Sequence, residues 1–70
     1  MLAKDAILYI QRFPENEPVF VLRAQDCLAS EMIEKWALRA RAMNVNNDKV
    51  TDALACAEEM LQWPIRKIPD

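Results

Sequence analysis

The sequence predicts an all-α protein, a small bundle of three to four helices in a single domain over residues 1–70. The chain has no glycine, which tight β-hairpin turns favour, whereas helices can be joined by turns built on asparagine or proline. Apolar residues recur at helical spacing in several segments. Only one short run is rich in β-branched and aromatic residues, so a strand there would have no partner within the chain.

The first helix is expected over residues 3–13. Its apolar residues recur at helical spacing, and they are Ala6, Ile7, Ile10 and Phe13. Pro14 ends the run, because proline cannot continue a helix.

The run of residues 18–26 is open to two interpretations. Pro18 suits the first position of a helix, where the missing N–H is not needed. Val19, Phe20 and Val21 instead favour a strand. We favour a short second helix whose apolar side fills the core. The alternative is an edge strand that pairs across a dimer.

The third helix is expected over residues 31–43, with Ser30 as its N-cap. One stripe carries its apolar residues, which are Ile33, Trp36, Ala37, Ala40 and Met43. Trp36 is therefore predicted to lie in the core. Glu31 and Lys35 are an i,i+4 pair in the favourable orientation.

The fourth helix is expected over residues 48–62, after an asparagine-rich turn in which Asn46 or Asn47 provides the cap. Its apolar face consists of Val50, Ala53, Leu54, Ala57, Met60 and Leu61. Pro64 ends it, and an extended C-terminal tail is expected to follow.

The composition limits the classes of function. There is no histidine, the commonest general base and metal ligand, and no glycine-rich phosphate loop. We therefore expect no enzymatic activity, no catalytic residue, no cofactor and no metal site. No run of 18 apolar residues suggests a membrane span, and no signal peptide is recognised, so a cytoplasmic location is expected. In that reducing compartment Cys27 and Cys56 are expected as thiols.

The apolar content is 53%, above the about 45–50% of a typical domain, although so short a chain buries only about 60% of its unfolded surface. Excess apolar surface points to a partner, so the expected function is a protein–protein interaction module that self-associates, most simply as a homodimer. The expected partner-binding residues are Phe20, Leu38, Trp63 and Ile65 as apolar anchors, with Arg23 and Arg39 at the rim. Trp63 has a second interpretation, as a lid folded over the core with the tail.

The alternative function is a nucleic-acid-binding protein of helix-turn-helix type. The net charge of −2 and the acidic fourth helix argue against it, since such proteins present a basic face.

The strings PVFVLRAQD and IEKWALRA, with the asparagine-rich turn after them, resemble a segment of small uncharacterised proteins from phages and bacterial genomes. The resemblance spans roughly residues 5–63 and brings no assigned activity. It implies a phage or prophage context. In that context the partner would be a host protein that the chain binds and inhibits in the host cytoplasm.

Overall fold

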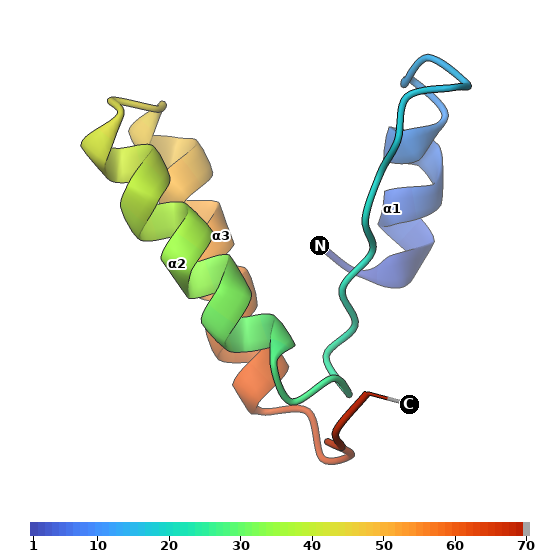
Figure 1. The fold of residues 1–70 in the computed structure, drawn as a ribbon, viewed down its shortest axis with the longest axis vertical. Coiled ribbons are helices and arrows are strands. Elements are labelled where there is room, and N and C mark those ends of the chain that lie inside the picture. The colour runs from blue at the N-terminus through green and yellow to red at the C-terminus, as the bar shows by residue number, and fades with distance from the viewer. Residues whose placement is uncertain (70) are drawn as a thin grey trace.

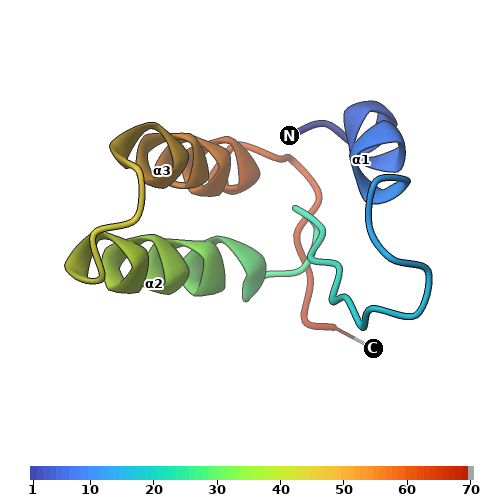
Figure 2. The ribbon, with the colours of Figure 1, turned by 90° about the horizontal axis from the view of Figure 1, so that it is seen from above.

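The computed structural model describes residues 1–69 and contains three helices, α1 (Ala3–Ile10), α2 (Ala29–Ala42) and α3 (Asn47–Leu61). Helices α2 and α3 lie side by side and antiparallel, whereas α1 stands apart and is joined to them by an extended segment (Figure 1, Figure 2). The described residues form no strand. The all-α prediction is confirmed, with three helices.

The α2–α3 hairpin is built on small side chains. Ala37, Ala40 and Val50 are buried together, and Val50 is the largest side chain that is fully buried. Ala29 and Ala57 are buried along the same seam. Small residues at the contact let two helices approach closely, but they contribute little apolar area each. The core is therefore thin.

The turn between α2 and α3 follows the asparagine chemistry that the sequence indicates. Asn44 has a φ of 61°, a left-handed conformation that asparagine tolerates. The N–H of Val45 donates to the carbonyl of Ala40 at 3.0 Å, which closes the end of α2. The side chain of Asn46 accepts from the N–H of Asp48 at 2.8 Å and caps α3.

The start of α2 differs from the prediction. The helix begins at Ala29, and Ser30 is a buried residue of the first turn, so the expected Ser30 cap is wrong. The N-cap position is Leu28, and no side chain caps the helix. Asp26 shapes the turn that leads into it. Its Oδ1 accepts from the N–H of Leu28 at 2.8 Å, and its carbonyl accepts from the N–H of Ala29 at 3.0 Å.

The predicted helix over residues 18–26 does not form. The chain is extended up to Arg23 and then turns, and residues 18–22 make no backbone hydrogen bond to any other described residue. Val19 and Val21 are β-branched and lower the helix propensity of so short a run. Phe20 is 87% exposed, so this segment does not fill the core.

Two further boundaries follow from local geometry. α1 ends at Ile10 rather than at residue 13, because the N–H of Phe13 donates to the carbonyl of Ile10 in a tighter terminal turn. Trp36 is 49% exposed, so its predicted place in the core is wrong. The buried positions of α2 are held by alanines and Ser30, and Ile33 beside them is partly buried. Trp36 falls at the edge of that seam.

The C-terminal tail returns to the start of α2. The N–H of Lys67 donates to the carbonyl of Gln25 at 2.7 Å, and the N–H of Cys27 donates to the carbonyl of Lys67 at 2.9 Å. The guanidinium of Arg66 donates to the carbonyl of Cys27 at 3.1 Å. These contacts close the open end of the hairpin.

Candidate interaction surface

Helix α2 and the residue that follows it, Met43, carry an exposed apolar row beside the alanine seam. Met32, Trp36 and Met43 are spaced four and seven residues apart, so at about 100° per residue they lie within about 40° of one another. Each of the three is about half exposed or more. The row therefore offers apolar side chains that α3 does not cover.

Helix α3 carries a matching row. Cys56 and Met60 are one turn apart and partly buried, and Trp63 continues their spacing just after the helix, where it is 52% exposed. Because both helices are right-handed and run antiparallel, the two rows flank the seam on the same side. We call these six residues the hairpin face: Met32, Trp36, Met43, Cys56, Met60 and Trp63.

The hairpin face is turned toward the N-terminal part of the chain. The N-terminal amine of Met1 donates to the Sγ of Cys56 at 3.8 Å, and α1 lies on this side of the hairpin in Figure 1. The other flank is polar. It carries Glu34 on α2, and on α3 it carries Glu58, whose carboxylate accepts from the amide of Gln62 at 3.2 Å. The hairpin is thus amphipathic as a unit.

The N-terminal arm, residues 1–23, contains no buried residue. No Cα of α1 lies within 8 Å of a Cα in α2 or α3. Ile7 and Ile10 lie on one side of α1, and Leu8 lies about 100° from Ile7 and about 160° from Ile10. Ile7 and Leu8 are each more than 60% exposed. The arm therefore exposes apolar side chains on two sides.

The exposed area of the whole chain is large for its mass. A folded monomer of 8.1 kDa is expected to expose about 4,500 Å², whereas this chain exposes 6130 Å². The Cα radius of gyration is 12.9 Å, against about 11 Å for a typical domain of this length. The excess of about 1,600 Å² is twice the area that one partner buries in a standard interface.

The six sequence-predicted contact residues do not form one patch. Trp63 ends the hairpin face, and Arg39 lies beside Met32 and Met43 at its rim. Leu38 is 49% exposed on the side of α2 that faces away from α3, well clear of that row. Phe20 lies on the arm.

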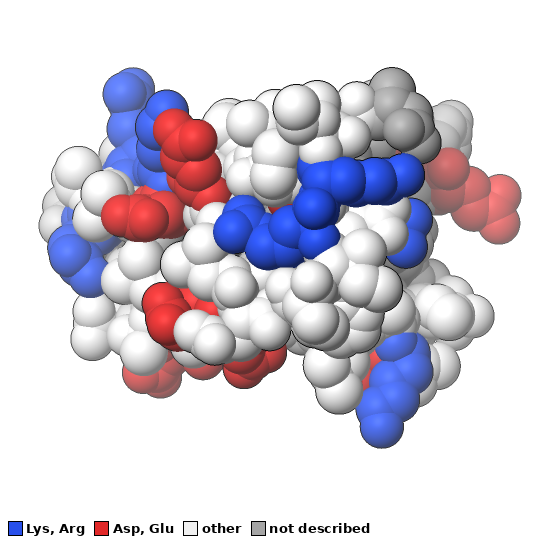
Figure 3. Space-filling view, turned by 90° about the horizontal axis from the view of Figure 1, so that it is seen from below, with Lys and Arg blue, Asp and Glu red and all other residues white. Residues whose placement is uncertain are grey.

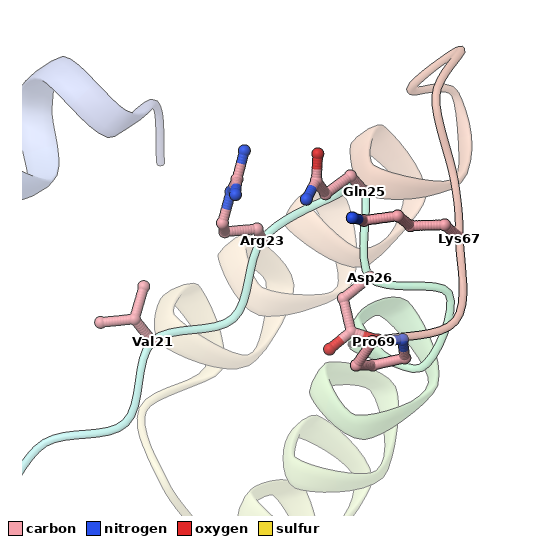
Figure 4. Close-up of a pocket in the computed structure, with 6 residues that line it drawn as sticks. All are labelled: Val21, Arg23, Gln25, Asp26, Lys67 and Pro69. Carbon is pink, nitrogen blue, oxygen red and sulfur yellow. The ribbon is translucent and has the colours of Figure 1, made fainter.

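The remaining two residues lie at the tail. Ile65 is exposed, and Arg23 lines an open pocket with Val21, Gln25, Asp26, Lys67 and Pro69 (Figure 4). Four of the lining side chains are polar, those of Arg23, Gln25, Asp26 and Lys67, and the apolar ones are Val21 and Pro69.

Sequence reasoning missed Met32 as a contact residue and placed Met43 and Met60 in the core. Each belongs to an apolar helical pattern, which would be buried in a bundle with one more packed helix. Whether such residues lie in a core or on a surface depends on how many helices pack together, and among the described residues only α2 and α3 do so.

No group of three His, Cys, Asp or Glu side chains among the described residues is arranged to hold a metal ion. Cys27 and Cys56 are free thiols and are partly buried. Within the described part of the chain, no helix has the length and apolar character needed to cross a membrane.

The surface charge is mixed. Lys35 and Glu31 form the expected exposed ion pair on α2, at 3.1 Å. Seen from below, basic side chains gather near the middle of the face with acidic ones beside them (Figure 3). Helices α2 and α3 run antiparallel, whereas a helix-turn-helix motif sets its two helices at about 90–120°. Neither feature supports the nucleic-acid alternative.

Comparison of the chain with protein-family models, with curated proteins and with solved structures gives no match.

Proposed function

We propose that this chain is a non-enzymatic helical protein–protein interaction module that self-associates. The observation that carries the proposal is the excess of about 1,600 Å² of exposed surface, in a chain whose apolar side chains largely lie outside its core. Surface of this kind is unfavourable in water and is removed by association. The thin alanine core leaves association as the main remaining source of stability.

The experiment that tests this function is thermal unfolding over a hundredfold range of protein concentration. A folded unit that exists only as an assembly gains stability with concentration, so its melting temperature rises as the protein is concentrated. A melting temperature that is independent of concentration contradicts the proposal. Circular dichroism at 222 nm follows the helices directly.

A second surface is available for a different protein. Leu38 and Ala42 lie next to each other on the outer side of α2, away from the hairpin face. We assign this side to a partner other than a second copy, which is a host protein in the host cytoplasm if the chain is phage-encoded. The exposed residues Phe20 and Ile65 are further anchors in this proposal, and Arg23 is a rim residue.

Binding to duplex DNA is the outcome expected of the alternative function. A protein that binds a DNA groove binds tightly at low salt, and its affinity falls steeply as the salt concentration rises. The affinity also falls when arginines that contact phosphates are removed. We expect no binding of this chain to duplex DNA at low salt. The Arg39→Ala and Arg41→Ala variants should behave like the wild type in this assay.

A further inference from the structure

We propose that the hairpin face of one copy is covered by the N-terminal arm of a second copy, so that two copies exchange arms in a twofold-symmetric dimer. The proposal rests on the self-association proposed above and names its occupant. In it, the side of α1 with Ile7 and Ile10 packs on Met32, Trp36 and Met60 of the other copy.

The arm is built to reach another molecule. Residues 18–22 are extended and have no backbone partner among residues 1–69, and no Cα of α1 lies within 8 Å of a Cα in α2 or α3. At about 3.3 Å per residue, five extended residues span about 17 Å, more than the about 10 Å between packed helices. Exchange of an identical element is a low-cost route to a dimer.

The two-sided apolar character of α1 selects a second copy over closure within one chain. One hairpin face can cover only one side of a helix. If the side with Ile7 and Ile10 lies on a hairpin face, Leu8 points away from it and stays exposed in a closed monomer. In the exchanged dimer the two arms meet near the twofold axis, where each Leu8 contacts the other copy.

The area agrees with this arrangement. The excess surface of about 1,600 Å² per chain gives about 3,200 Å² for two chains. Obligate homodimer interfaces bury roughly 2,000–5,000 Å² and are more apolar than transient ones. The hairpin face also has suitable chemistry, because methionine adapts its shape to a partner and tryptophan dominates interface energetics.

The closing experiment is a complementation test by native mass spectrometry on the full chain. The arm variant carries Ile7→Lys and Ile10→Lys, and the face variant carries Met32→Glu and Trp36→Glu. Each is expected to be monomeric alone. An equimolar mixture is expected to form a 1:1 heterodimer, because the intact arm of the face variant meets the intact face of the arm variant. Leu38→Glu is the matched control and is expected to stay dimeric.

The outcomes separate this proposal from the function on which it rests. A monomeric wild type overturns both. A dimeric wild type with both variants still dimeric overturns arm exchange and leaves self-association standing.

If both variants are monomeric and do not complement, isotope-filtered NMR on mixed labelled and unlabelled wild type decides. Contacts between the Ile10 methyls of one copy and the Met32 methyl of the other are expected, and their absence overturns arm exchange.

Discussion

Trp36 and Leu38 provide a matched pair for measuring where self-association occurs. They lie two residues apart on α2, and each is 49% exposed. Trp36 lies in the hairpin face, and Leu38 lies on the outer side of the helix. Alanine at either position keeps the helix propensity high, so the two substitutions differ mainly in the surface that they remove.

The magnitude follows from the exposed area. A tryptophan buries about 150–250 Å² when fully covered, so half of Trp36 leaves about 100 Å² for a partner to cover. At about 25 cal/mol/Å² this is worth about 2.5 kcal/mol at each of two equivalent sites. The two sites together give an upper value of about 5 kcal/mol per dimer. Because alanine retains part of the area and the partner covers Trp36 incompletely, we expect a loss of binding free energy of about 3 kcal/mol per dimer. This loss raises the dissociation constant about 100-fold.

Sedimentation equilibrium on the wild type, Trp36→Ala and Leu38→Ala measures the dimer dissociation constants. We expect about a 100-fold increase for Trp36→Ala and less than about a threefold change for Leu38→Ala. Helix content by circular dichroism at high protein concentration confirms that both variants fold. An equal effect of the two substitutions, or a larger effect of Leu38→Ala, refutes the placement of the interface.

Three further predictions concern the hairpin itself. Val50→Ala removes the largest fully buried side chain and is expected to lower the free energy of unfolding by about 2 kcal/mol, measured by urea denaturation, with the exposed Thr51→Ala nearly neutral. Asn46→Ala removes the cap of α3 and is expected to cost about 1 kcal/mol in the same assay, an effect that a substitution of Asn47 should not reproduce. Deletion of residues 66–70 removes the acceptor of the Cys27 N–H, which should then exchange with solvent faster in hydrogen-exchange NMR; unchanged protection of Cys27 contradicts the role of the tail.

The parts of the fold that the sequence predicts well are those decided locally. The asparagine at position 44 can adopt a left-handed conformation, and Asn46 can cap the next helix, whatever the rest of the chain does. The apolar periodicity of α3 is sustained over four turns, and its inner positions Val50 and Ala57 are buried as expected.

The parts that sequence reasoning did not resolve depend on what covers them. The run from Val19 to Leu22 is apolar enough for a buried helix or an edge strand, and only its neighbours decide between the two. Within residues 1–69 it forms no helix and pairs with no strand, and it is extended. Trp36 shows the same limit. Its spacing fits a buried apolar stripe, but among the described residues no third helix packs on α2 and α3 to cover it.

Some of the contact residues can be identified from local spacing, and others depend on what packs against them. Trp63 and Arg39 can be identified from their positions off the apolar stripes, and both lie at the hairpin face. Met32 gives no such signal, because an apolar residue next to the predicted stripe is buried or exposed according to how many helices pack on α2, and among the described residues only α3 does so.

The central claim, that the folded unit is an assembly of two copies, is tested most directly by the molar mass of the wild type in solution. Multi-angle light scattering over a dilution series is expected to give about 16 kDa at high concentration, twice the 8.1 kDa of the chain. Dilution should then reduce the mass together with the helix content, because the arm and the hairpin face lose their cover at the same time. A folded species of 8.1 kDa at every concentration would contradict the account.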